Sequence, residues 1–444
     1  MKRYVFFALA ACLAIGGAQG ADTQVAPVAG YRTQAAWIQL GPGGQAEVRA
    51  VSAGGCPFVV FGDAAKSDVP MVIRASATAD FPAVCSLPIP SGVKRVSVAM
   101  SRMGEPAHTT MQELHIPLAE PQRILVLGDT GCRIKGTFVQ ACNDPKAWPF
   151  AGLAQAAADQ HPDLILHLGD YLYRESPCPA DFAGCAGSPY GDNWASWDAD
   201  FFTPAAPLLA AAPWIVIRGN HEDCNRAGPG FLRLLGPVAY DPAAPCAVHL
   251  DPYAVPVGSR TLAILDSADA SDRPVDEKAV PLYAKDFETL KAMANAGPGR
   301  ELWLGTHRPI WAAISFMGIP AGGNATMIEA AGDLSAFSAV SLMLSGHIHA
   351  FEAINYVSRI PPQIVAGHGG DTLDVTPANL RGTIFQGDSG VHVKTGFSVG
   401  GFGFLMLTRE KDSEGWAVQL FDSAGKPIRQ CTYANRSIVC LAPK

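Results

Sequence analysis

Five apolar runs in residues 122–350 end in the same way, with a glycine close to a side chain that can bind a metal ion. Ligand sites of α/β sheets form where the carboxyl ends of the strands meet. Glycine lets the chain turn sharply there because it has no Cβ. The sequence therefore predicts that five loops bring their polar side chains to one edge of a sheet. The five blocks are Gly128-Asp129-Thr130-Gly131, Gly169-Asp170-Tyr171-Leu172-Tyr173, Gly219-Asn220-His221-Glu222, Gly305-Thr306-His307 and Gly346-His347-Ile348-His349.

The segments between these blocks alternate between buried-strand and helical patterns, which predicts a layered α/β domain over residues 122–444. Helices are expected at Ala151–Asp159 and Val280–Ala296, and the Gly-, Pro- and Cys-rich segment Pro177–Trp197 is expected to be an insertion. The expected strands are Ile124–Leu127, Leu164–Leu168, Trp214–Ile217, Leu262–Leu265, Leu302–Leu304 and Leu342–Leu344.

The preceding residues, 31–118, have a different pattern of short extended runs separated by Gly and Pro, for example at Phe58–Phe61 and Arg95–Met100. Short strands at this spacing indicate a small β-sandwich. Residues 119–121 are expected to link it to the α/β domain.

The first twenty residues have the pattern of a secretory signal peptide. Lys2 and Arg3 precede an apolar stretch, and small residues stand before a cleavage point after Gly20. The alternative is a lipoprotein signal with the lipid anchor on Cys12. Either route predicts that the protein leaves the cytoplasm and is secreted or periplasmic.

Ten cysteines remain of the 11 in the chain when Cys12 is set aside, and they fall into pairs that are close in sequence. Oxidising compartments favour disulfides, so we predict a framework of five bonds. The pairs are Cys56–Cys85, Cys132–Cys142, Cys178–Cys185, Cys224–Cys246 and Cys431–Cys440.

Composition argues against a nucleic-acid partner and against a membrane-spanning helix. The net charge is −7, whereas nucleic-acid binding would require a basic excess or stripe. No uninterrupted apolar stretch reaches 18 residues, so no transmembrane helix is expected in the mature protein.

The polar groups of the five blocks are two carboxylates, a phenol, an amide and three imidazoles. This is too many ligands for one closed ion, and a carboxylate can bridge two, so the set indicates a pair of metals. A phenolate from Tyr173 would favour a trivalent ion such as Fe³⁺. The resulting centre would carry a net positive charge and attract an anion.

In this order and spacing, the blocks resemble those of the calcineurin-like metallophosphoesterases, and within them the purple acid phosphatases. Tyr173 in Gly169-Asp170-x-x-Tyr173 is typical of that subgroup, whereas Leu304 stands where the family has Val. The resemblance covers roughly residues 122–410. It implies a four-layer metallophosphoesterase-type α/β sandwich, with the N-terminal β-sandwich of fibronectin-III-like type that is common in large members.

The resemblance also implies a dinuclear centre of Fe³⁺ plus a divalent ion, Fe²⁺, Zn²⁺ or Mn²⁺. A hydroxide held by these metals would attack the phosphorus of a small phosphate monoester in line. His221 would protonate the leaving oxygen, and Arg308 and His368 are candidates for substrate contact. The implied ligands are Asp129, Tyr173 and His349 for Fe³⁺, Asn220, His307 and His347 for the divalent ion, and Asp170 as the bridge.

Two other functions fit the same residues. One is a phosphodiesterase or nucleotidase, in which the insertion Pro177–Trp197 narrows access to the same metals. The other is a non-catalytic, metal-binding surface protein, although all seven ligands and His221 are present.

Overall fold

The computed structural model describes residues 31–62, 68–100, 110–296, 300–316, 319–357, 359–385, 390–410 and 415–441. The predicted signal segment with Cys12 lies outside these ranges. Within them, no helix is both long enough and apolar enough to cross a membrane.

The larger sheet has eleven strands in the order β26-β25-β24-β23-β9-β12-β13-β1-β2-β6-β5. Its central strands β9, β12 and β13 are parallel, and antiparallel strands extend the sheet from β9 on one side. These strands are β9 (Arg123–Leu127), β12 (Leu164–His167), β13 (Trp214–Val216), β23 (Gly403–Arg409), β24 (Trp416–Asp422), β25 (Pro427–Ala434) and β26 (Ser437–Cys440).

The second sheet has seven strands in the order β14-β15-β16-β19-β21-β20-β22. Strands β15, β16, β19 and β21 are parallel. The bounds are β14 (Tyr253–Val257), β15 (Arg260–Ile264), β16 (Glu301–Thr306), β19 (Val340–Ser345), β20 (Phe351–Tyr356), β21 (Gln363–Ala366) and β22 (Val393–Val399).

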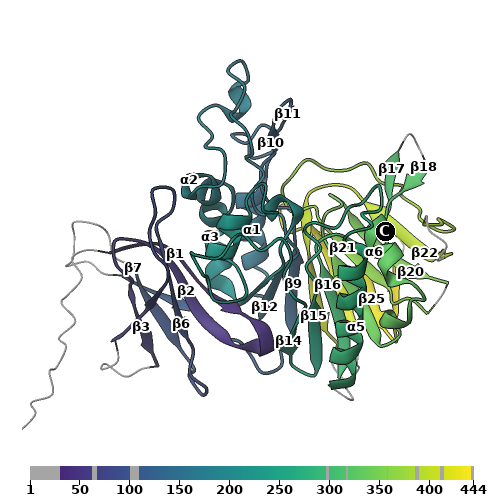
Figure 1. Cartoon of the computed structure of the whole chain (residues 1–444), viewed down its shortest axis with the longest axis horizontal. Coiled ribbons are helices and arrows are strands. Elements are labelled where there is room, and N and C mark those ends of the chain that lie inside the picture. The colour runs from purple at the N-terminus through teal and green to yellow at the C-terminus, as the bar shows by residue number, and fades with distance from the viewer. Residues whose placement is uncertain are drawn as a thin grey trace, which may run out of the picture.

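The two sheets pack face to face, and helices cover their outer faces. Along β9, Ile124 and Val126 face Trp303 and other residues of the second sheet. Leu125 and Leu127 point the other way and pack under the helices. Side chains of a strand alternate between faces, so β9 is apolar on both. Helices α1, α3 and α4 pack on the larger sheet, and α5 and α6 on the smaller one. Figure 1 shows α5 and α6 over the smaller sheet.

The result is the four-layer α/β arrangement that the sequence predicted, and most elements begin or end within two residues of their expected bounds. The α-helices are α1 (Phe150–Ala158), α2 (Trp194–Trp197), α3 (Thr203–Ala211), α4 (Gly228–Leu234), α5 (Val280–Ala296) and α6 (Ala325–Ala331). Two small hairpins, β10–β11 (Ile134–Lys135 and Phe138–Val139) and β17–β18 (Ile314–Phe316 and Ile319–Ala321), project on one side of the molecule (Figure 1).

The N-terminal strands form two sheets around a core of their own. One sheet has the order β4-β3-β7-β8, and the other is the β1-β2-β6-β5 end of the eleven-stranded sheet. The bounds are β1 (Arg32–Leu40), β2 (Ala46–Ala53), β3 (Phe58–Phe61), β4 (Asp68–Pro70), β5 (Val72–Ala75), β6 (Ala83–Pro88), β7 (Val96–Met100) and β8 (Thr110–Leu114).

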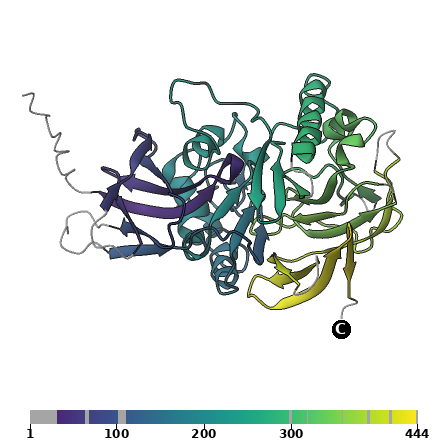
Figure 2. The ribbon, with the colours of Figure 1, turned by 90° about the horizontal axis from the view of Figure 1, so that it is seen from below.

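The N-terminal region is joined to the rest by a shared sheet, because β1 pairs in parallel with β13. Pairing covers a strand edge that would otherwise expose unpaired backbone groups. Gln39 and Arg49 strengthen the junction by donating hydrogen bonds to the carbonyls of Leu235 and Gly236, each at 2.8 Å. Figure 2 shows this region at one end of the molecule and β23–β26 toward the other. The division into domains 31–118 and 122–444 stays a prediction.

All five disulfides join the cysteines that were paired from the sequence. Cys178–Cys185 ties together part of the insertion Pro177–Trp197, which otherwise contains only a short 3₁₀ turn and α2. The other four are Cys56–Cys85, Cys132–Cys142, Cys224–Cys246 and Cys431–Cys440.

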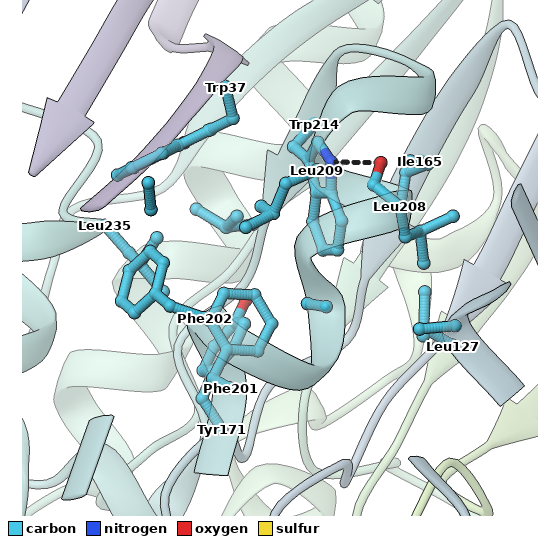
Figure 3. Packing of buried hydrophobic residues seen from close by; sticks show 14 of the residues in the cluster. Trp37, Leu127, Ile165, Tyr171, Phe201, Phe202, Leu208, Leu209, Trp214 and Leu235 are labelled. Carbon is cyan, nitrogen blue, oxygen red and sulfur yellow. Dashed lines mark hydrogen bonds between the residues drawn. The ribbon is translucent and has the colours of Figure 1, made fainter. Parts of the chain in front are cut away.

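Trp37 of β1 packs into the core beneath the helices of the larger sheet. Its side chain is fully buried, and its ring centroid lies 5.4 Å from that of Phe202 (Figure 3).

We predict that Trp37→Ala lowers the free energy of unfolding by about 3–5 kcal/mol, since it leaves a cavity in a close-packed core. Denaturant titration measures the change. Val72→Ala, at a side chain that is 58% exposed, serves as the control and should cost less than about 1 kcal/mol. An equal effect of both substitutions would contradict this role of Trp37.

Candidate metal centre

The predicted ligands lie where the carboxyl ends of the two sheets meet. Asp129, Asp170 and Asn220 follow β9, β12 and β13 of the larger sheet, and His307 and His347 follow β16 and β19 of the smaller one. Several hydrogen bonds join the sheets at this edge, and two of them involve predicted ligands directly. The backbone N–H of His347 donates to Asp129 Oδ2 at 2.9 Å, and His307 Nδ1 donates to the carbonyl of Leu168 at 2.8 Å.

One half of the cluster is centred on the hydroxyl of Tyr173. This oxygen lies 3.1 Å from Asp129 Oδ1, 2.8 Å from Asp170 Oδ2 and 3.1 Å from His349 Nε2. The same imidazole nitrogen is 3.3 Å from Asp129 Oδ1. The four groups expected to hold the trivalent ion, counting the bridge, therefore share one small volume.

The other half is centred on His307. Its Nε2 lies 3.3 Å from Asp170 Oδ2 and 3.0 Å from Oδ1 of the Asn220 side chain. The same end of the Asn220 carboxamide group lies 2.8 Å from His347 Nδ1. Atoms of Asp170, His307 and His347 that could bind a metal all lie within 4.8 Å of one another. Asp170 Oδ2 takes part in both halves, which is the position that a bridging carboxylate requires.

The hydrogen bonds around the three histidines direct a lone pair of each toward the cluster. His307 and His349 donate from Nδ1 to the backbone carbonyls of Leu168 and Thr372, so their Nε2 atoms face the cluster and become acceptors when they lose their protons. His347 donates from Nε2 to Asp272 Oδ2 at 3.0 Å and leaves Nδ1 as the acceptor. Such outer hydrogen bonds orient imidazoles that bind metals. Atoms with a lone pair to offer greatly outnumber hydrogen-bond donors in the cluster. The cluster is therefore suited to binding cations.

The electrostatics of the cluster also favour the binding of cations. Burial and the carboxylates of Asp129 and Asp170 raise the pKa of Tyr173 well above its ordinary value. Burial alone would lower the pKa values of His307 and His349, but neighbouring carboxylates outweigh it and raise them to about 9 and about 10. The protein thus surrounds these atoms with negative potential. Bound cations would displace the protons and reverse these shifts.

The backbone at three of the ligands adopts the left-handed conformation, which costs about 1–3 kcal/mol at residues other than glycine. The φ angles are 56° at Asp129, 60° at Asp170 and 70° at His347. Gly169 has φ 102°, and a Cβ there would lie 2.6 Å from His307 Nδ1. The sharp turns aim the side chains into the cluster and explain the glycine that starts the second block.

Glu222, the last residue of the third block, is a part of the site whose function was not predicted from the sequence. Its buried carboxylate accepts backbone N–H groups of Asp170 at 3.0 Å, Tyr171 at 2.8 Å and Gly219 at 3.1 Å. Burial and the charge of Asp170 raise the pKa of Glu222 to about 8. Glu222 therefore fixes the loop of the bridging carboxylate to the loop of Asn220.

His221, the predicted proton donor, lies beside the cluster, with its ring 3.8 Å from that of Tyr173. Its Nε2 is 3.9 Å from Asp170 Oδ2, and its Nδ1 is 2.5 Å from Glu175 Oε1. Partial burial raises the pKa of Glu175, but His221 and Lys135 outweigh this and hold it at about 2. Glu175 follows the second block by two residues, and nothing in that spacing alone marks it.

The two predicted substrate contacts differ in position. Arg308 reaches the cluster, because its guanidinium donates to Asp272 and lies 3.1 Å from His347 Nε2. His368 is buried and packs near Phe351, and its two ring nitrogens have no hydrogen-bond partner among the described residues. Burial lowers its pKa to about 3.

Asp272 was not predicted from the sequence, yet it holds His347 in place and also accepts from Asn324 Nδ2 at 2.9 Å. We predict that Asp272→Ala weakens metal binding about 10–100-fold, because the imidazole loses its orienting acceptor. Metal content per chain after dialysis against graded chelator measures the change. His161→Asn, at an exposed histidine, should retain metal like the wild type. Unchanged retention in Asp272→Ala would contradict this function of Asp272.

Comparison with known proteins gives the same fold. The purple acid phosphatase PPD1 from seeds of yellow lupin (Lupinus luteus) superposes with a TM-score of 0.55 at 13% identity, covering 90% of this chain and 74% of that one. PhoD superposes with a TM-score of 0.54 at 11% identity, covering 92% of each chain. At these identities the likeness shows the fold alone. No curated protein matches the chain significantly.

The calcineurin-like phosphoesterase family matches residues 122–351, which are more than half of the chain. This range contains all five blocks, and it confirms the family to which they pointed. The chain belongs to the calcineurin-like phosphoesterases, a family of metal-dependent phosphoester hydrolases.

Proposed function

We propose that the protein is an exported phosphatase that hydrolyses phosphate monoesters at a dinuclear metal centre, like the purple acid phosphatases. The observation that carries this proposal is the position of the Tyr173 hydroxyl among Asp129, Asp170 and His349, next to a second group that shares Asp170. The likeness of the fold to a purple acid phosphatase supports it.

In this proposal Asp129, Tyr173 and His349 would hold Fe³⁺, Asn220, His307 and His347 would hold Fe²⁺, Zn²⁺ or Mn²⁺, and Asp170 would be the ligand common to both. When bound, the two ions would activate a water molecule for attack on phosphorus and neutralise charge on the phosphate oxygens. A phenolate and two carboxylates suit a hard trivalent ion, whereas an amide and two imidazoles suit a divalent one.

The residues of the chain would then position the ester and move the proton. The contact of Nδ1 with Glu175 Oε1, at 2.5 Å, leaves His221 Nε2 on the side of the cluster, where it can donate a proton to the leaving oxygen. Glu175 thereby holds the ring of His221 beside the cluster. General acid catalysis of this kind contributes about 10²–10⁴-fold.

Export is supported by the five disulfides, which are typical of oxidising compartments. The signal-like residues 1–20 agree with this, and we propose a secreted or periplasmic location.

The activity is tested by comparing p-nitrophenyl phosphate with bis(p-nitrophenyl) phosphate. We predict that the monoester is hydrolysed with the higher kcat/KM, and that Asn220→Ala lowers this value by more than about 100-fold through loss of a ligand. The control is Asn295→Ala, at an exposed position of α5. Faster hydrolysis of the diester would favour a phosphodiesterase, and absence of turnover with metals bound would favour a metal-binding surface protein. Full activity of Asn220→Ala would contradict the assignment of the site.

The trivalent ion is tested by colour. A bond between a Tyr173 phenolate and Fe³⁺ should give a visible charge-transfer band and a violet to pink protein. We predict that Tyr173→Phe abolishes the band while the protein still retains its divalent metal, as measured by absorption spectroscopy and metal analysis together. An iron-loaded wild-type protein without the band would contradict ligation by Tyr173.

A further inference from the structure

A pocket of about 400 Å³ lies directly beside the candidate metal centre. The ring of His347 forms part of its wall, and the same ring directs Nδ1 toward Asn220 at 2.8 Å. The pocket and the candidate metal centre therefore share the ring of His347, so a phosphate ester bound at the centre would have its organic group close to this pocket. The volume falls in the range of small-molecule sites.

The wall of the pocket is mostly apolar. It consists of Pro309, Ile314 and Ile348 together with the backbone of Gly322 and Gly323. Ile314 stands at the start of the β17–β18 hairpin and packs on the same small cluster as Ile348. A Cβ at Gly322 would overlap the carbonyl oxygen of Ala312, so the chain approaches closely there and presents only backbone.

The polar side chains among the residues that line the pocket are Asp272, Arg273 and His347. Asp272 is already engaged by Arg308, His347 and Asn324. Arg273 is exposed to solvent. Since a buried polar group without a partner is costly, a sugar or a base placed against Pro309 and Ile314 would lose more hydrogen bonds than it gains.

We propose that this pocket receives the apolar organic group, aromatic or short alkyl, of a phosphate monoester whose phosphate lies on the metal centre. The inference rests on the proposed function and narrows it from phosphate monoesters in general to esters of apolar alcohols. Ile314 is then a residue that determines specificity, and it acts through contact with the organic group.

The test compares 1-naphthyl phosphate with glycerol 2-phosphate, whose organic group is polar. We expect Ile314→Ser to lower the ratio of the two kcat/KM values about fivefold relative to wild type, because less apolar surface is buried against the naphthyl ring. Differences in intrinsic reactivity between the esters cancel in this comparison. Ile314→Val should keep most of the ratio, and Ile73→Ser, at a side chain that is 60% exposed on β5, should keep all of it.

A second measurement separates binding from chemistry. Phenylphosphonate and methylphosphonate are not hydrolysed, and we expect the wild type to bind the phenyl compound more tightly and Ile314→Ser to lose most of that difference. If both esters are hydrolysed but Ile314→Ser leaves the ratio and the phosphonate difference unchanged, the pocket assignment is overturned and the proposed function stands. If the metal-loaded wild type hydrolyses neither ester, the proposed function is overturned and the pocket assignment with it.

Discussion

The candidate site depends on one carboxylate, that of Asp170, at the junction of two sheets. Its Oδ2 lies 2.8 Å from the Tyr173 hydroxyl and 3.3 Å from His307 Nε2, so it is shared by residues that follow strands of different sheets. Burial opposes the charge of this group, but His307 and His221 outweigh burial and hold the pKa of Asp170 well below its ordinary value. An ionised, buried carboxylate needs compensating positive charge, and a pair of cations would supply it more fully than protonated imidazoles do.

The surrounding fold explains how this arrangement is maintained. The left-handed backbone at Asp129, Asp170 and His347 is unfavourable in isolation. Glu222 compensates by accepting several backbone N–H groups of the neighbouring loops. The apolar layer between the sheets keeps the strand ends in register.

We propose that specificity for the organic group of the ester comes from the pocket beside His347. Binding of the phosphate and recognition of the organic group would then use different surfaces.

Much of this could be predicted from the sequence, and the limits have physical causes. The five blocks are local, each a strand end, a glycine and a polar residue, so periodicity and turn chemistry were sufficient to find them. The cysteine pairs are close in sequence, and all five were predicted. Asp272 and Glu175 were missed because their functions arise from contacts across the fold, with His347 and His221. The continuation of the larger sheet through β1 was missed for the same reason, since strand pairing over long separations leaves no local pattern.

The central claim is that two metal ions lie side by side on Asp170. Metal analysis combined with X-ray absorption spectroscopy of the purified protein tests it most directly. We predict two ions per chain, separated by about 3.5–4 Å, with metal–metal scattering that disappears in Asp170→Ala. A single ion per chain, or two ions without scattering from each other, would contradict it.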